Sequence, residues 1–592
     1  MSTPDRLFKL RSHMATLGVD ACIITSADPH LSEYPASHWK FREWISGFSG
    51  SAGTIVVTNE EAGLWTDSRY FLQAEQQLID SGIDLFKQGE VNVPDYKEWL
   101  SEVLNPGAVV GVNGKTMTVN EYRQLAKSLK KADIRLDSKL FIEDDIWEGR
   151  PIIPDDGIFE LGTEYCGLSR TEKISIIREK MKQDGATHYI VTTLDEVAWL
   201  LNFRGKDVKF NPVFHAYLVI SQNQVNLFID PHKLTSNIGR QLSKEDVKIF
   251  IYDDFYNFIK DIPPLSTVLI DPARTNSIVY SFIPQQSTKV EKISIITNLK
   301  AQKNRTEIEN FRKAMVKDGV AMVKFLYWLD KSIKNEEITE YSAARKLSSF
   351  RAEQENYHGD SFNTISGYAG NGAIVHYAVK EETASKLEPK GLYLIDSGGQ
   401  YSESTTDITR TIALGPLTEE EKTDFTLVLK GNIGLDMAVF PVGTRGVHLD
   451  ILARQAMWQH GINYGHGTGH GIGHFLCVHE GPQSIRPQDN GVEILEGMIS
   501  SNEPGIYKPD KHGIRLENLI LTIKDQETEF GSFMKFETLT LCPIDLRAVN
   551  VSMLNQVEID WLNQYHQKVY KLLSPLLEED ENEWLKIFCR EI

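Results

Sequence analysis

The chain has 592 residues, five scattered cysteines and a formal net charge of −19. This length is too great for a single hydrophobic core and predicts several domains of roughly 150 residues each. The negative charge disfavours nucleic acid as a partner, because a nucleic-acid binder needs a basic face. The cysteines form no Cys-x-x-Cys pair, which argues against a thiolate zinc site and against a disulfide framework.

The N-terminal segment "MSTPDRLFKLRSHM" lacks the apolar stretch of a signal peptide. No run of about 18 apolar residues occurs elsewhere, so we expect no membrane span. These two features favour a cytoplasmic location.

The N-terminal half contains two similar stretches. In the first, "LGVDACIITSADP" (Leu17–Pro29) leads to Asp67, and in the second, "DGATHYIVTTLDE" (Asp184–Glu196) leads to Asp230. Each stretch predicts a helix, a glycine, a buried strand and then a hairpin that ends in an aspartate. We therefore expect two related α/β domains, with chance similarity as the alternative.

Two breaks divide the chain into three predicted domains. The segment "EGRPIIPDDG" (Glu148–Gly157) is typical of a linker, and a long amphipathic helix is predicted to begin near Lys303. The expected domains are residues 1–150, 151–300 and 301–592. The third begins with helices and continues with the predicted strands "GLYLIDSGG", "GMISSNEPGIY", "RLENLILTI" and "ETLTLCPI".

Four carboxylates lie in or beside these predicted strands. Asp396 and Asp407 occur in "LIDSGGQYSESTTDITRT", Glu503 in "SNEPGIY" and Glu517 in "GIRLENLIL". An ionised carboxylate in a strand core costs several kcal/mol unless it is paired or binds a metal. Any one of these acids could be a turn residue or half of a salt bridge, but the set indicates a shared cation.

The segment Asn463–Pro482, "NYGHGTGHGIGHFLCVHEGP", adds imidazoles on a stretch too rich in glycine for an ordinary helix. Carboxylate oxygens with a single imidazole suit Mn²⁺, Co²⁺ or Zn²⁺. Four carboxylates can hold two such ions if two of them bridge, and a pair of ions that shares a hydroxide forms a hydrolytic centre.

The order Asp396, Asp407, His470, Glu503, Glu517, with "HGTGHGIG", "NEPG" and "GIRLEN", resembles the metal-binding pattern of the pita-bread metallopeptidases. That group includes methionine aminopeptidase, prolidase and aminopeptidase P. The segments "SGFSGSAGT", "WTDSRYFLQA", "LDEVAWLLNFRG" and "NGAIVHYA" are most similar to the long, three-domain, cytosolic aminopeptidase P, or Xaa-Pro aminopeptidase. The resemblance implies an α/β (α+β) chain: two creatinase-like N-terminal domains followed by a pita-bread catalytic domain, assembled as a homodimer.

The resemblance also implies roles for individual residues. Asp407 and Glu517 would bridge two ions, Asp396 would complete one ion, and His470 with Glu503 would complete the other. Glu503, His376 and His479 would be catalytic. The implied substrate-contacting residues are Arg42, His376, His466, His470, His479 and Arg515.

Four residues keep open alternatives. Arg42 could be an ordinary surface arginine, and Arg515 could pair with a bridging carboxylate, with His466, or in a plain salt bridge. His474 has no counterpart in the family pattern and is predicted to be structural. Trp458 is a candidate interface residue, although a core position is expected.

The predicted function is therefore a hydrolase that uses two divalent ions, with Mn²⁺ preferred, to remove an N-terminal residue when proline is second. Prolidase, which cuts only dipeptides, is the first alternative, but the duplicated front half favours the aminopeptidase. A binding scaffold that kept the fold and lost turnover is the second alternative.

Overall fold

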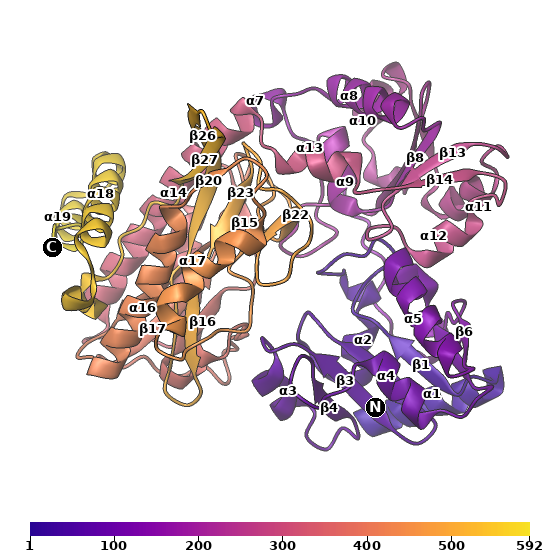
Figure 1. Cartoon of the computed structure of the whole chain (residues 1–592), viewed down its shortest axis with the longest axis horizontal. Coiled ribbons are helices and arrows are strands. Elements are labelled where there is room, and N and C mark those ends of the chain that lie inside the picture. Colours follow the sequence, from indigo (N-terminus) through magenta and orange to yellow (C-terminus); the bar gives the residue numbers. More distant parts are fainter. The chain divides into compact units, whose positions relative to one another are not determined.

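The computed structural model describes residues 1–592, which form two compact units (Figure 1). The first unit comprises Met1–Leu161 and Leu168–Thr297, and the second comprises Gly162–Gly167 and Asn298–Ile592. The division into three domains at residues 150/151 and 300/301 stays a prediction. None of the helices combines the length and the apolar character that crossing a bilayer requires.

The first unit contains a six-stranded sheet in the order β4-β3-β2-β1-β5-β6. Its central strand β1 is antiparallel to β2 and parallel to β5. The strands are β1 (Ala21–Ile24), β2 (Thr54–Thr58), β3 (Ala62–Thr66), β4 (Asp84–Lys87), β5 (Val109–Val112) and β6 (Arg135–Asp137). The helices are α1 (Thr3–Leu17), α2 (Phe41–Ser46), α3 (Phe71–Gln77), α4 (Tyr96–Val103), α5 (Val119–Lys131) and α6 (Glu143–Ile146).

Both faces of this sheet are buried, which explains the continuous apolar run of β1. Cys22 and Ile24 lie in one core cluster with residues of α1. Ala21 and Ile23 lie in a second cluster with residues of α5. Because successive side chains of a strand point to opposite faces, a strand covered on both sides needs no polar alternation.

The second sheet of this unit repeats the same order, β12-β11-β10-β8-β13-β14. Its central strand β8 is likewise antiparallel to β10 and parallel to β13. The strands are β8 (His188–Val191), β10 (Ala216–Ser221), β11 (Val225–Ile229), β12 (Val247–Phe250), β13 (Thr267–Ile270) and β14 (Thr288–Glu291), with the short pair β7 (Phe159–Glu160) and β9 (Phe203–Arg204) beside them. The helices are α8 (Arg170–Gln183), α9 (Leu194–Leu201), α10 (Ser236–Lys244), α11 (Phe255–Lys260) and α12 (Ser277–Phe282), and α13 (Ile295–Ala301) contains the boundary with the second unit.

The two sheets confirm the internal duplication. Gly18 and Gly185 separate the first helix of each copy from its first strand, with φ of +65° and +67°. Glycine is suited to both positions because left-handed backbone is costly for other residues. Asp67 directly follows β3, and Asp230 directly follows β11, at the end of each predicted hairpin.

The second unit is built on a three-stranded and a six-stranded sheet. The orders are β16-β17-β19 and β20-β27-β26-β23-β21-β22, and the pairs β15-β18 and β24-β25 complete the strands. The strands are β15 (Tyr357–Asp360), β16 (Ile365–Tyr368), β17 (Leu392–Ser397), β18 (Gly399–Tyr401), β19 (Ile408–Ala413), β20 (Val439–Pro441), β21 (Gly469–Gly471), β22 (Glu480–Ile485), β23 (Ile499–Asn502), β24 (Gly505–Lys508), β25 (His512–Arg515), β26 (Asn518–Thr528) and β27 (Gly531–Thr538). The helices are α7 (Thr163–Cys166), α14 (Arg305–Ser332), α15 (Glu340–Ala352), α16 (Glu419–Asp436), α17 (Gly446–Trp458), α18 (Gln556–Leu573) and α19 (Glu579–Phe588).

Helix α14 begins at Arg305, two residues after the predicted start. Asn304 caps this helix. Its side-chain oxygen accepts a hydrogen bond from the N–H of Glu307, and the Glu307 carboxylate accepts one from the N–H of Asn304. The Asn310 side chain donates to the carbonyls of Glu164 and Tyr165, so α7 belongs to this unit. The core beneath the strands is formed largely by α14, α15, α16 and α18, and Figure 1 shows α16 and α17, in orange, running alongside the strands.

Two sequence-based expectations are wrong. The segment "ETLTLCPI" is not a strand beyond Thr538, where β27 ends. The hydroxyl of Tyr565 donates to the carbonyls of Thr540 and Cys542, so these groups need no ladder partner. Trp458 is 47% exposed rather than in the core, because it lies on the outer face of α17.

Candidate metal centre

Two aspartates lie at neighbouring positions where two paired strands come together. Strands β17 and β19 are antiparallel, and Asp396 is the register partner of Thr409. Asp407 immediately precedes β19, and both aspartates are buried. The antiparallel pairing of β17 and β19 therefore brings two acids that are 11 residues apart in the sequence to neighbouring positions.

His470 and Glu503 come from the six-stranded sheet. His470 lies in β21, which pairs with β23 through Gly471 and Ser500, and Glu503 directly follows β23. His470 Nε2 is 3.6 Å from Asp407 Oδ2 and 3.6 Å from Glu503 Oε1. The imidazole therefore faces carboxylates from both sheets.

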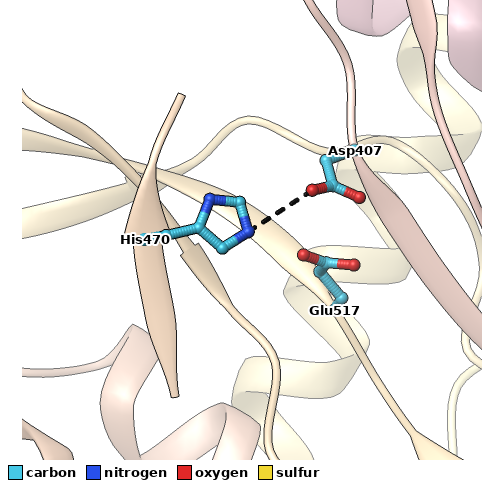
Figure 2. A group of neighbouring side chains, drawn as sticks. All are labelled: Asp407, His470 and Glu517. Atoms are coloured by element: carbon cyan, nitrogen blue, oxygen red, sulfur yellow. Dashed lines mark ion pairs between the residues drawn. The ribbon is translucent and has the colours of Figure 1, made fainter. Parts of the chain in front are cut away.

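Glu517 enters from the connection between β25 and β26. Its N–H donates to the carbonyl of Thr409 at 3.1 Å, and its Oε2 accepts from the hydroxyl of Thr409 at 2.9 Å. The ligand atoms of Asp407, His470 and Glu517 all lie within 4.8 Å of one another. Figure 2 shows these three side chains pointing toward one another from separate elements.

Burial and mutual repulsion raise the pKa of three of these carboxyl groups. Burial is the largest cause for each, and the charge of Glu517 is the next for Asp407 and Glu503, whose pKa values lie well above their usual range. The pKa of Glu517 rises to about 8, first through burial and then through the charge of Asp396. Such a cluster is fully ionised at neutral pH only if cations offset the repulsion.

The donor set fits divalent cations. Two ligand atoms that share one tetrahedral ion at about 2.1 Å lie about 3.4 Å apart, close to the 3.6 Å between His470 Nε2 and each facing carboxylate oxygen. Asp396 Oδ1 is buried and has no protein hydrogen-bond partner. Carboxylates with one imidazole suit Mn²⁺, Co²⁺ or Zn²⁺.

Arg515 connects the acids to two further side chains. Its Nη2 donates to Asp396 Oδ2, and its Nη1 donates to the hydroxyl of Tyr507 at 2.8 Å. His466 Nε2 lies 2.8 Å from the same hydroxyl. Tyr507, which the sequence analysis missed, therefore links Arg515 to His466; its position shortly after Glu503, at the end of the "NEPGIY" stretch, is the only sequence signal for it.

Family models match the chain in four consecutive segments. Models of the creatinase/prolidase N-terminal domain match residues 6–141 and 149–307. The model of metallopeptidase family M24 matches residues 309–524, and that of the C-terminal region of this peptidase family matches residues 532–592. The M24 segment contains all five converging metal-ligand candidates.

Relatives of known family match the chain from end to end. A probable Xaa-Pro aminopeptidase P of Laccaria bicolor is 41% identical over 100% of this chain and 94% of its own length. The Xaa-Pro aminopeptidase ApepP of Drosophila melanogaster is 38% identical over 99% of this chain and 98% of its own. The chain belongs to the Xaa-Pro aminopeptidase P family of M24 metallopeptidases.

Solved structures agree with this family assignment. The X-prolyl aminopeptidase of Caenorhabditis elegans, described as a cytosolic enzyme with a dinuclear active site, is 35% identical and covers 100% of both chains with a TM-score of 0.96. An Xaa-Pro dipeptidase of Bacillus anthracis, 23% identical with a TM-score of 0.51, covers 64% of this chain and shares the fold. The fold expectation of creatinase-like domains followed by a pita-bread domain is confirmed.

Two further histidines of this family member were expected at the site. The ring of His479 lies 4.4 Å from that of His470, in a perpendicular arrangement. His376 follows the short helical turn Ala369–Ala373, and the carbonyl of the preceding Val375 accepts from Arg515 Nη2 at 3.5 Å. His479 thus lies directly beside a ligand candidate, and His376 is joined to the site through its neighbour.

His474 and Arg42 are two further residues singled out from the sequence. His474 is buried, and its ring lies 5.8 Å from that of Phe311. Arg42 lies in the first unit, where its guanidinium donates to the carbonyls of Phe48 and Gly50. A substrate role for Arg42 stays a prediction.

Asn432 of α16 is a supporting residue that the sequence analysis missed. Its side-chain N–H groups donate to the carbonyl of Asn502 at 2.9 Å and to that of Leu516 at 3.1 Å. These are the residues immediately before Glu503 and Glu517. One helix side chain therefore fixes the backbone beside two carboxylates, and its position among the other polar residues of α16 gave no signal of this role.

Arg410 of β19 is a second missed residue. Its Nη1 donates to the carbonyl of Glu517 at 2.7 Å, while its Nη2 donates to the carbonyl of Cys542 and to the hydroxyl of Tyr565. The backbone of Glu517 is therefore attached to the C-terminal region of the M24 unit.

Proposed function

We propose that this chain is a dinuclear metal-dependent aminopeptidase that hydrolyses the N-terminal Xaa-Pro bond of peptides. The observation that carries the proposal is the convergence of His470 with buried carboxylates whose mutual repulsion bound cations would offset. The family membership supplies the substrate class, since the relatives named above are Xaa-Pro aminopeptidases.

Two ions are proposed to share Asp407 and Glu517, with Asp396 completing one ion and His470 and Glu503 the other. This assignment is supported by the position of His470 Nε2 between Asp407 and Glu503 and by the buried, unpartnered Oδ1 of Asp396. When bound, such ions would lower the pKa of the attacking water and polarise the scissile carbonyl.

The side chains around the ions supply the remaining steps. Glu503 accepts a proton from the attacking water and passes it to the departing proline nitrogen. His376 and His479 donate hydrogen bonds to the scissile carbonyl oxygen as charge develops on it. His466 and Arg515, joined through Tyr507, complete the substrate contacts proposed within this unit.

Proline in the second position explains why such contacts are needed. The Xaa-Pro bond has no N–H to donate, its φ is fixed near −65°, and the preceding residue is extended. A peptidase that grips the backbone N–H binds this bond poorly. Affinity must come instead from the substrate's free amine near Asp396 and the metals, from its carbonyl oxygen and from the proline ring.

We further propose Mn²⁺ as the metal, because an oxygen-rich donor set with one imidazole suits this hard ion, with Co²⁺ or Zn²⁺ as alternatives. We also propose a cytoplasmic location and a C₂ homodimer, the commonest closed assembly. Trp458 and Ile451, 47% and 49% exposed on α17, are the proposed interface residues. A sedimentation mass near 67.1 kDa, that of one chain, would exclude the dimer.

The deciding assay compares three peptides with Mn²⁺-loaded protein. Cleavage of both Arg-Pro and Arg-Pro-Pro, with Arg-Ala-Ala resistant, is the expected result. Cleavage of Arg-Pro alone would indicate a prolidase. Two bound ions without turnover on any peptide would indicate a binding scaffold.

A further inference from the structure

A buried ion pair lies behind the two aspartates of the metal centre. Asp318 of α14 and Arg351 of α15 form a two-pronged contact, with Arg351 Nε 2.8 Å from Asp318 Oδ1 and Nη2 3.1 Å from Oδ2. The residues are 4% and 0% exposed. A buried ion pair is weak evidence for stability, since removing two charges from water offsets most of their attraction. The other contacts of Asp318 and Arg351 therefore indicate the role of the pair.

The remaining hydrogen bonds of the pair reach residues adjacent to both aspartates. Asp318 Oδ1 accepts from the hydroxyl of Thr406 at 2.9 Å, and Thr406 immediately precedes Asp407. Arg351 Nη2 reaches the carbonyl of Ser397 at 3.4 Å, and Ser397 immediately follows Asp396. One ion pair thus contacts the chain beside each of two metal-ligand candidates.

The turn between these aspartates is closed by the same network. The Thr406 hydroxyl, which donates to Asp318, accepts from the N–H of Gly399 at 2.8 Å. The N–H of Thr406 donates to the carbonyl of Gly399 at 2.8 Å. The hydroxyl of Tyr401 donates to Asp318 Oδ1 at 3.0 Å. The Thr406 carbonyl accepts from the hydroxyl of Ser361 at 2.9 Å, so each polar group of Thr406 has a partner and the chain before Asp407 has little freedom.

We propose that Asp318 and Arg351 are positioning residues that hold Asp396 and Asp407 at the separation required for metal binding. The inference rests on the proposed metal function. It goes beyond that function because neither residue touches an ion or substrate. The pair joins two helices to the strand ends, so the helices set the geometry of the aspartates.

The two carboxylates from the other sheet have separate support. Glu503 and Glu517 follow residues whose carbonyls are held by Asn432 of α16. Loss of the Asp318–Arg351 pair should therefore disturb one ion more than the other. The affected ion is the one assigned to Asp396, because the other keeps His470, Glu503 and Glu517.

Two variants of the full chain test the proposal. Thr406→Val keeps the shape of the side chain and removes only the hydroxyl link, so it leaves no buried charge unpaired. Asp318→Asn removes the negative charge of the Asp318–Arg351 ion pair. The matched control is Asp436→Asn, because Asp436 is also an aspartate 4% exposed on a helix, and its carboxylate accepts from Thr538, away from the residues beside the aspartates.

The measurement is calorimetric titration of metal-free protein with Mn²⁺, with thermal melts of the same samples. We expect the affinity for one of two ions to fall 10–100-fold in Thr406→Val and Asp318→Asn, as for other changes to groups that orient metal ligands. The affinity for the second ion should fall less, because that ion keeps ligands that do not depend on Thr406, and kcat of Thr406→Val should recover at saturating Mn²⁺. The control should bind both ions like the wild type.

The possible results distinguish failure of the positioning role from failure of the proposed metal function. Equal loss of both ions in the control, or wild-type affinities for both ions in Thr406→Val, would overturn the positioning role even if Asp318→Asn does not fold. Wild-type protein that takes up no Mn²⁺ would instead overturn the proposed metal function.

Discussion

The Nε2 atom of His470 lies 3.6 Å from Asp407 Oδ2 and at the same distance from Glu503 Oε1. One imidazole thereby joins a carboxylate of the three-stranded sheet to one of the six-stranded sheet. Neither distance is that of a hydrogen bond, since those fall near 3 Å. Both distances are compatible with ligands that share one proposed ion.

Replacement of a proposed bridging ligand gives the first prediction. Asp407→Ala and Glu517→Ala should each abolish measurable turnover and lower the metal content below two ions per chain, because each carboxylate is proposed to contact both ions. Elemental analysis after dialysis, together with Arg-Pro-Pro cleavage, measures both effects. Asp489→Ala, at an exposed aspartate, serves as the control. A variant with two ions and near-normal turnover would refute the ligand assignment.

Glu503→Gln gives the second prediction. The change is nearly isosteric but removes the proton acceptor, and general acid–base catalysis commonly contributes 10²–10⁴-fold. We therefore expect kcat to fall by about 10²-fold or more, while KM changes by less than about threefold. Steady-state kinetics on Arg-Pro-Pro measures the split, with the exposed Glu493→Gln as control. Comparable changes in kcat and KM would count against the proton relay.

The raised pKa values give a third prediction, about the metal-free protein. Below about pH 4.5 Glu517 is protonated in both the folded and the unfolded chain, so it does not alter stability. Between that pH and about 8, the unfolded chain releases the proton while the folded chain keeps it. The free energy of unfolding should therefore fall as pH rises through this window, and the loss is complete above it.

Urea denaturation at pH 5.5 and 7.5 measures this dependence. The Glu517→Gln variant should show a weaker pH dependence than the wild type, because its amide does not titrate. Saturating Mn²⁺ should reverse the trend, since binding requires ionised ligands and becomes tighter as pH rises. Metal-free wild-type protein that gained stability between these pH values would contradict the prediction.

Much of the site could be predicted because its ligands follow local patterns. Asp396 interrupts a run of apolar, β-prone residues, and the glycines around His470 exclude an ordinary helix, so both positions are visible within a few residues of sequence. The residues that hold these ligands in place are not visible in the local sequence. Asn432 on α16 contacts backbone beside Glu517, and Tyr565 on α18 replaces a strand partner at Cys542. Such pairings depend on how distant elements pack, which a single sequence does not reveal.

The same reason explains which parts of the fold were predicted. The duplicated sheets follow from repeated local patterns, and the start of α14 follows from a capping box at Asn304. The segment after Thr538 has the composition of a strand, yet side chains from β19 and α18 bind its carbonyls. Tertiary contacts overrode local β-propensity there.

The fourth prediction concerns His376 and His479, the proposed donors to the scissile carbonyl oxygen. Loss of one such donor commonly costs 10²–10³-fold in kcat. His479→Ala and His376→Ala should each lower kcat/KM on Arg-Pro-Pro by about this factor while both ions remain bound, because neither residue is an assigned ligand. The exposed His460→Ala is the control. Metal content must be measured above all for His479→Ala, because the ring of His479 lies 4.4 Å from that of His470. If His479→Ala lost an ion together with activity, His479 would act by supporting the ligand rather than by contacting substrate. Loss of activity with two ions retained would support the proposed role.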